Sequence, residues 1–264
     1  MPEVLTADRV TIVYDDLGPR AGTPVVLCHG LAAAGEQLAA DARYFAGLGY
    51  RVLVPDLRGH GRSGTPAPAL ADGFSIPRMA ADLTDVLDHA GVGPVHWVGN
   101  SLGGILALFL LEDQAARLRT LATFGTCYRL RLPRWVGRLI PLSYGLAGAP
   151  LTARLGARLT TSNRAARPLL ERLLARFDPN VGRLVAANLA SYDLRASAMA
   201  ARLPILLLRG GRDTAVNAAL GPTLRAMRGR PDFTVVELPE AGHCANLDAS
   251  ADWRAALLGF WRGR

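Results

Sequence analysis

Short apolar runs alternate with amphipathic stretches along most of this chain. Val25–Cys28, Arg51–Val54 and Val95–Val98 have the length and composition of buried strands, whereas Ile76–Ala90 carries its apolar residues on one face at helical spacing. Strands that alternate with helices in this way predict right-handed βαβ units and a mainly parallel sheet.

The same pattern predicts the elements that flank this region. A hairpin is expected at the start of the chain, a helix before the second strand, three strands further along and a helix at the end. Their predicted positions are Val4–Tyr14, about Glu36–Leu48, Leu118–Phe124, Pro204–Arg209, Phe233–Leu238 and Ser250–Trp261.

The alternation stops after Phe124 and resumes at Pro204. Between them, helical patterns such as Pro168–Phe177 and Val181–Tyr192 occur without a strand-like run. We therefore expect a helical cap over residues 126–199, inserted into a core made of residues 1–125 and 200–264.

Three polar residues follow predicted strands in an order that indicates nucleophilic catalysis. Ser101 lies in a Gly-x-Ser-x-Gly turn between a strand and a helix, and this turn requires small residues on both sides of the serine. Asp213 follows the strand Pro204–Arg209, and His243 follows the strand Phe233–Leu238. Serine, acid and histidine in this order form the triad of the α/β-hydrolase fold.

Five segments in family order give the chain its resemblance to the α/β-hydrolase superfamily, in particular to small capped bacterial esterases, enol-lactonases, C–C hydrolases and cofactor-free haloperoxidases. The resemblance implies a mostly parallel sheet of about eight strands, flanked by helices, with the cap after strand 6. The segments are Cys28-His29-Gly30-Leu31, Pro55 to Ser63, Gly99 to Gly104, Gly211-Arg212-Asp213 and Gly242-His243.

Each catalytic assignment has a structural alternative. Ser101 could be a helix N-cap, Asp213 a turn residue and His243 a loop residue. Some family members carry the acid after the sixth strand, but that region of this chain has no carboxylate, which favours Asp213. Asp248 is expected in the first turn, or as the cap, of the final helix.

The oxyanion of an acyl-transfer reaction needs hydrogen-bond donors fixed in advance. The backbone N–H groups of Leu31 and Leu102 occupy the matching positions. Structural roles are expected for four other polar residues near these motifs. They are His29, Asp56, Arg58 and His60.

Charge is concentrated in the predicted cap. The chain has no lysine, and Thr126–Arg195 holds 12 arginines and three acidic residues, a net of +9, whereas the rest has a net of −1. The arginines are interpreted as solvated outer faces of helices or, alternatively, as attracting an anionic substrate, an acidic carrier protein or a membrane surface. The candidate basic rim consists of Arg129, Arg131, Arg134 and Arg138. The aromatic candidates for the substrate pocket are Tyr128, Trp135, Tyr144 and Tyr192.

The predicted function is hydrolysis of a carboxylic ester through an acyl-enzyme on Ser101, with His243 as base and Asp213 as the acid that orients it. A lactonase or enol-lactonase, a C–C hydrolase and a thioesterase remain alternatives with the same triad, followed by a perhydrolase and a non-catalytic ligand receptor. Epoxide hydrolases and haloalkane dehalogenases are disfavoured because the resemblance to them would require aspartate at position 101.

Composition sets the remaining expectations. Three cysteines without metal-ligand spacing and scattered histidines predict no metal and no cofactor. The start of the chain lacks the features of a signal peptide, and no apolar stretch reaches the length of a membrane span, so a cytoplasmic protein without stable membrane insertion is expected. No nucleic-acid-binding motif accompanies the high arginine content, and the oligomeric state is left open.

Overall fold

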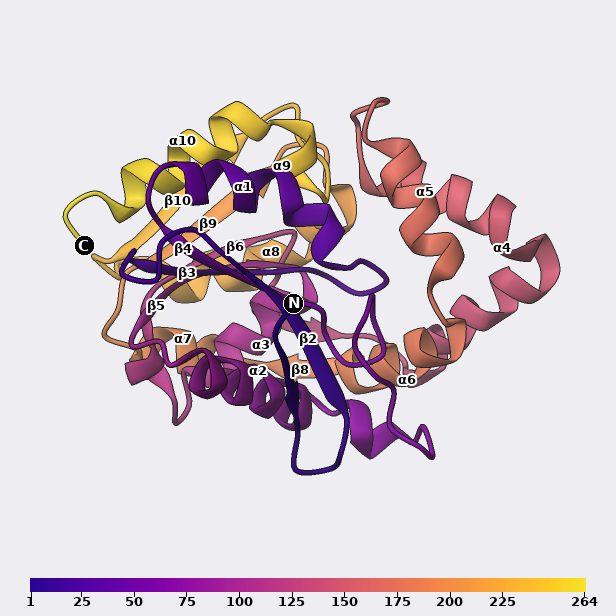
Figure 1. Cartoon of the computed structure of the whole chain (residues 1–264). Helices are drawn as coiled ribbons and strands as arrows, with labels where there is room; N and C mark the ends of the chain where they lie inside the picture. Colours follow the sequence, from indigo (N-terminus) through magenta and orange to yellow (C-terminus); the bar gives the residue numbers. More distant parts are fainter.

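An eight-stranded sheet runs through the protein in the order β1-β2-β4-β3-β5-β6-β9-β10 (Figure 1). The computed structural model describes residues 1–264 apart from the side chain of Arg134. The pairs β1–β2 and β2–β4 are antiparallel, and the other pairs of this sheet are parallel. The strands are β1 (Glu3–Leu5), β2 (Thr11–Leu17), β3 (Pro24–Cys28), β4 (Arg51–Pro55), β5 (Val95–Asn100), β6 (Leu118–Phe124), β9 (Ile205–Gly210) and β10 (Phe233–Leu238).

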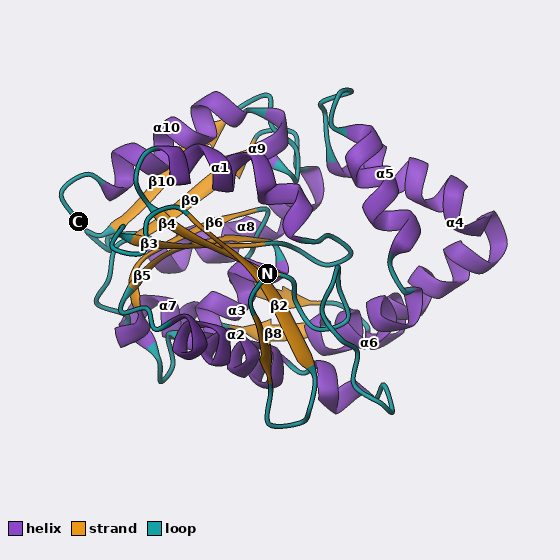
Figure 2. Cartoon of the chain, in the orientation of Figure 1, coloured by secondary structure: helices purple, strands orange, loops and turns teal.

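Helices cover both faces of the sheet (Figure 2). The helices α1 (Ala39–Gly47) and α10 (Ser250–Trp261) pack on one face, and α9 (Ala245–Asp248) leads into α10. On the other face lie α2 (Ile76–Ala90), α3 (Leu102–Leu110), α7 (Arg195–Ala200) and α8 (Thr214–Met227).

Burial on both faces explains the unbroken apolar runs of the central strands. All residues of β4 and β5 are buried, because parallel strands between two helical layers have no solvent-facing side. The mainly parallel α/β sheet predicted from the alternation is confirmed, and so is the number of about eight strands that the family resemblance implied. This architecture brings the ends of β5, β9 and β10, and thus the three candidate catalytic residues, to one edge of the sheet.

Between β6 and β9 the chain leaves the sheet. It forms the helices α4 (Leu139–Thr160), α5 (Arg167–Arg176) and α6 (Pro179–Leu189), and a short 3₁₀ helix, η4 (Arg134–Arg138), precedes α4. Figure 1 shows α4 and α5 beside the sheet rather than against its faces. Helix α4 bends at Gly148, whose φ of 75° lies outside helical values.

Two local expectations are wrong. The region contains a two-stranded antiparallel ribbon of β7 (Arg129–Arg131) and β8 (Ser191–Asp193), where no strand was predicted. Asp248 ends α9 and does not begin the final helix. Its carboxylate accepts hydrogen bonds from the backbone N–H groups of Gly242 (2.6 Å) and Asn163 (3.2 Å), so it joins the loop before His243 to the segment that follows α4.

Candidate active site

Ser101 stands at a sharp turn between β5 and α3. Its φ and ψ are 49° and −111°, a conformation that is strained for any residue with a side chain. Its backbone N–H donates to the carbonyl of Phe124 at 2.9 Å, which fixes the turn to the neighbouring strand β6. The hydrogen bond to the sheet thus maintains the strained conformation, and the side chain of Ser101 lies at the edge of the sheet.

The glycines around Ser101 are required by close backbone packing. A Cβ at Gly99 would lie 2.4 Å from the backbone nitrogen of Gly104, and a Cβ at Gly103 would lie 2.4 Å from the carbonyl oxygen of Cys28. Neither neighbour is a flexible side chain that could move aside. The Gly-x-Ser-x-Gly pattern therefore reflects steric need on both sides of the serine.

Asp213 and His243 are hydrogen-bonded to each other. The Nδ1 of His243 lies 2.8 Å from the Oδ2 of Asp213, and because an ionised carboxylate only accepts, the imidazole donates from Nδ1. The other carboxylate oxygen accepts from the backbone N–H of Val216 at 3.3 Å, at the start of α8. This arrangement leaves Nε2 of His243 as the basic nitrogen.

Asn100 binds the backbone of His243, and Gly125 leaves room for its ring. The side-chain amide of Asn100 donates to the carbonyl oxygens of His243 (3.1 Å) and Phe124 (3.2 Å), and its oxygen accepts from Gln37 at 3.0 Å. A Cβ at Gly125 would lie 3.0 Å from Cε1 of His243. The sequence analysis gave Asn100 no role at the site; the signal that could have found it is an amide at the end of a buried strand, directly before Ser101.

The backbone N–H groups of Leu31 and Leu102 lie on the two segments next to Ser101. Leu102 is the first residue of α3, and a Cβ at the preceding loop residue Gly30 would come within 3.2 Å of Cβ of Ser101. Among the described contacts, neither N–H has an acceptor within the chain. Both groups are therefore available to an oxygen atom bound beside the serine, and α3 directs the positive end of its dipole to the same place.

Two cavities meet at Ser101 and His243. The first has a volume of about 640 Å³ and is lined mainly by aliphatic side chains, among them Ile105, Leu130 and Val216. The second has a volume of about 400 Å³ and extends under α4, where hydroxyl groups of Ser143 and Thr152 join apolar residues. A group bound at Ser101 can thus extend in two directions.

Comparison with known proteins places the chain in a family. A family model described as "alpha/beta hydrolase fold" matches residues 23–250. The chain belongs to this family. The resemblance to the α/β-hydrolase superfamily that the sequence motifs indicated is confirmed.

Relatives of this α/β hydrolase include several bacterial enzymes. A protein of Variovorax paradoxus (strain S110), named provisionally as the carbamate hydrolase RutD, is 28% identical over 94% of both chains. A non-heme chloroperoxidase of Burkholderia pyrrocinia is 38% identical, but the match covers 39% of this chain and 36% of the relative. These matches support a hydrolase family without defining the bond that is cleaved.

Solved structures show the same fold at lower identity. The enol-lactonase of Burkholderia xenovorans LB400 is 22% identical and superposes with a TM-score of 0.84, over 98% of this chain and 99% of the other. The esterase EaEST of Exiguobacterium antarcticum is 20% identical, with a TM-score of 0.84 over 98% of both chains. At this identity the likeness establishes the fold alone.

The aromatic residues predicted for the substrate pocket of the hydrolase divide into two groups. Tyr192 lines the larger cavity and Tyr144 lines the smaller one. Tyr128 lines neither, because it is fully buried in the core with its hydroxyl 3.1 Å from that of Thr123. Trp135 also lines neither, because its side chain is exposed on η4. These two residues therefore do not border either cavity at Ser101 in this structure.

The predicted basic rim is only partly assembled. Arg129 and Arg131 line the larger cavity, and Arg129 lies 3.7 Å from the carboxylate of Asp193 on the neighbouring strand of the ribbon. Arg138 is exposed on η4 and is not among the lining residues of either cavity. The side chain of Arg134 lies outside the described part of the structure.

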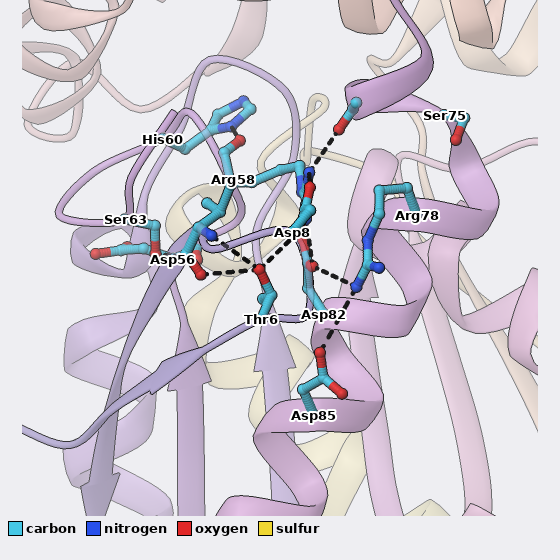
Figure 3. Close-up of polar contacts among 12 residues, drawn as sticks. Thr6, Asp8, Asp56, Arg58, His60, Ser63, Ser75, Arg78, Asp82 and Asp85 are labelled. Carbon is cyan, nitrogen blue, oxygen red and sulfur yellow. Dashed lines mark hydrogen bonds and ion pairs between the residues drawn. The ribbon is translucent and has the colours of Figure 1, made fainter. Parts of the chain in front are cut away.

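Arg58 anchors the loop that follows β4. Its guanidinium is fully buried and lies between the carboxylates of Asp82 (2.5 Å) and Asp8 (2.8 Å), as Figure 3 shows. Burial alone would lower the pKa of Arg58, but these hydrogen bonds raise it, so the group stays charged. It also donates to the carbonyl of Gly73 at 2.8 Å. Arg58 thus ties the loop to α2 and to the turn of the first hairpin.

The remaining polar residues of this region also make contacts inside the fold. Asp56 accepts from the backbone N–H of Gly35 at 2.6 Å and pairs with Arg62 at 2.6 Å, and His29 accepts from the backbone N–H of Leu57 at 3.0 Å. The three cysteines are buried free thiols. In the described part of the chain, no three His, Cys, Asp or Glu residues are grouped to hold a metal ion, and no helix is long and apolar enough to cross a membrane.

Proposed function

We propose that this α/β hydrolase cleaves a carboxylic ester through a covalent acyl-enzyme on Ser101. The observation that carries the proposal is the 2.8 Å hydrogen bond between His243 and Asp213 in a histidine that borders both cavities together with Ser101. A base oriented by a buried acid beside a strained, half-buried serine that lines both cavities is the arrangement that nucleophilic catalysis requires.

In the first half of the reaction, Ser101 Oγ attacks the ester carbonyl while Nε2 of His243 accepts its proton. Asp213 stabilises the resulting imidazolium and keeps the ring in the correct tautomer. The N–H groups of Leu31 and Leu102 donate to the oxyanion, and losing one such donor typically costs about 3 kcal/mol of transition-state stabilisation. The alcohol leaves with the proton from His243.

In the second half, His243 removes a proton from water, and the hydroxide attacks the acyl-enzyme. Collapse of the second tetrahedral intermediate releases the carboxylic acid and returns the proton to Ser101. Each proton removed by His243 is given back within the same half-reaction, so the triad ends in its starting state.

The two cavities favour an open-chain ester over a small lactone. An open-chain ester extends from its carbonyl carbon in two directions, whereas both sides of a lactone belong to one ring. The aliphatic lining of the larger cavity suits an apolar substituent, since burial of apolar surface provides about 25 cal/mol per Å². Lactonase activity remains the second candidate within the same triad chemistry.

We further propose that residues 126–199 act as the cap of the hydrolase core made by residues 1–125 and 200–264. Both cavities use this segment for part of their walls, through Leu130 and Tyr192 in one and Tyr144 and Thr152 in the other. Substrate choice would then depend on the segment that the sequence pattern describes least well.

Labelling with a fluorophosphonate probe tests the nucleophile. Wild-type protein should react stoichiometrically, and Ser101→Ala should not react, while Ser191→Ala, which removes an exposed serine from the ribbon, should keep full labelling. Turnover of a panel of p-nitrophenyl esters, lactones and thioesters then identifies the bond. Unlabelled but folded wild-type protein, or equal labelling of Ser101→Ala, would contradict the proposal.

A further inference from the structure

Helix α4 presents small residues to the protein and large apolar residues to solvent, which is the opposite of a helix that packs on a core. Its inner face carries small residues, with Ala153 and Ala157 buried and Gly156 so close to α5 that a Cβ would lie 3.0 Å from the side chain of Leu174. Its leucines face outward instead. A surface helix normally buries its large apolar residues, so this reversal needs an explanation.

The outward leucines occur along both halves of α4, before and after the bend at Gly148. Leu159 is 87% and Leu146 is 80% exposed, and among the other large apolar side chains described only that of Met1, at 82%, is comparably exposed. More than half of the large apolar side chains that the structure describes as exposed fall within residues 132–159. Without Leu132, which lines the larger cavity, we call this set the α4 surface; it consists of Trp135, Leu139, Leu142, Leu146, Leu151, Leu155 and Leu159.

Two uncharged polar residues of the same helix, Tyr144 and Thr152, point inward and have hydrogen-bond partners. Tyr144 donates its hydroxyl to the carbonyl of Leu174 at 2.7 Å, and Thr152 donates to the carbonyl of Ser143 at 2.9 Å across the bend. Both tyrosine and threonine also line the smaller cavity. The inner face is therefore committed to α5 and to the candidate active site, which leaves the leucines no place inside the protein.

Arginines accompany the α4 surface without acidic partners. Arg154 and Arg158 are exposed between the leucines of the second half of α4, and Arg131 and Arg138 are exposed near its beginning. The described contacts record no ion pair for these four side chains, and the sequence has no acidic residue between Asp113 and Glu171. The surface thus combines exposed leucines with uncompensated positive charge.

We propose that the α4 surface docks onto an anionic lipid bilayer. Leucine and tryptophan side chains enter the boundary between headgroups and acyl chains, and arginines bind the negatively charged headgroups, which is the composition of interfacial amphipathic helices. A second copy of the chain is the less favourable occupant, because a twofold interface would place the same unpaired arginines against each other.

Docking would place the bilayer on one side of α4 and the smaller cavity on the other. This part rests on the function proposed above: the ester would then be a lipophilic one that partitions into the membrane. The docking itself does not depend on the chemistry of Ser101, so the two proposals can fail separately.

Co-sedimentation with lipid vesicles tests the docking. Wild-type protein should bind vesicles that contain phosphatidylglycerol far better than vesicles of pure phosphatidylcholine, and added salt should weaken the binding. The double variant Leu146→Ser/Leu159→Ser should lose about ten-fold or more of its vesicle affinity, and so should Arg154→Gln/Arg158→Gln.

Matched controls separate docking from general effects. Leu5→Ser/Leu70→Ser removes two leucines of 60% and 61% exposure from other parts of the molecule and should bind like wild type, as should Ser101→Ala. Failure to bind phosphatidylglycerol vesicles, or equal loss in the control leucine variant, would overturn the proposal. So would a wild-type dimer in sedimentation velocity that Leu146→Ser/Leu159→Ser abolishes, because the surface would then belong to a second copy.

Discussion

At the scale of single residues, the candidate site depends on contacts that fix each side chain from outside its own segment. His243 sits in a loop, yet its ring is held by Asp213 and its backbone carbonyl by Asn100. Asp213 in turn is held by the first turn of α8 through Val216. Preorganisation of this kind is what lets a histidine act as a base without reorganising during the reaction.

The Asp213→Asn variant tests the role of the acid. An amide of the same shape preserves packing but can present its N–H to Nδ1, which favours the wrong tautomer of His243 and cannot stabilise imidazolium. We expect kcat for an activated ester to fall by about 10³- to 10⁴-fold. The melting temperature should change little. Asp232→Asn removes an exposed carboxylate and should keep full activity; a similar loss in both variants would contradict the assignment.

Residue-level reasoning from the sequence selected Ser101, Asp213 and His243 as candidates because each follows a strand and their order is distinctive. It proposed Tyr128 for the pocket, whereas the structure buries this side chain in the core, because an aromatic residue near a strand end can point to the core as well as to a cavity. It also missed the contact of Asn100 with His243, which joins residues far apart in the chain. A local sequence pattern shows neither the direction in which a side chain points nor its contacts with residues far away in the chain.

At the scale of elements, the sharp turn between β5 and α3 forms because glycines let its backbone lie in close contact with the backbone of neighbouring segments. The glycines allow β5, α3 and the loop after β3 to meet around Ser101. A helix that starts at Leu102 then aims its first N–H groups at the serine. The turn is therefore a structural unit whose stability and chemistry come from the same contacts.

Substituting alanine for each of two helical glycines separates the effect of close packing on stability from the effect of helix propensity. Gly103→Ala should lower the free energy of unfolding by about 3 kcal/mol or more, because its Cβ would meet the carbonyl of Cys28 at 2.4 Å. Gly47→Ala, at an exposed position with open space around it, should raise the free energy of unfolding by about 0.5 kcal/mol. Urea unfolding measures both, and equal effects would mean that the close contact at Gly103 relaxes freely.

The sequence predicted long elements well and short ones poorly. Ile76–Ala90 has enough turns for its period to be recognised, whereas the three-residue strands of the β7–β8 ribbon have no period at all. Asp248 matched the pattern of a helix start, but its carboxylate serves the loop before His243 and Asn163 instead. For α4, the sequence predicted only that residues 126–199 form a helical cap, and not which side of this helix faces solvent.

At the scale of the whole molecule, buried neutral histidines link stability to pH. His60 is buried against Phe177, with ring centroids 4.8 Å apart, and its Nδ1 donates to the carbonyl of Arg58. Burial, together with the nearby His29, lowers the pKa of His60 to about 3. Burial also lowers the pKa of His96 to about 4. Both rings therefore stay neutral in the folded protein at mildly acidic pH.

The sign of the effect follows from proton binding. Above pH 6.5 these histidines are neutral in both the folded and the unfolded state, and their titration does not affect stability. Between pH 6.5 and the lowered pKa values the unfolded chain binds protons that the folded protein does not, so stability falls as pH falls. Each histidine contributes at most about 1.4 kcal/mol per pH unit.

The His60→Phe variant isolates one of these contributions. Phenylalanine keeps a ring against Phe177 but cannot titrate, and at neutral pH it should cost about 1 kcal/mol because the carbonyl of Arg58 loses its donor. Between about pH 6.5 and pH 5, the free energy of unfolding should fall by about 1.5 kcal/mol less in the variant than in wild type. Urea unfolding at the two pH values gives the difference, with Gly47→Ala as a control that should shift both values equally. An unchanged pH dependence in His60→Phe would mean that this ring accepts a proton in the folded protein.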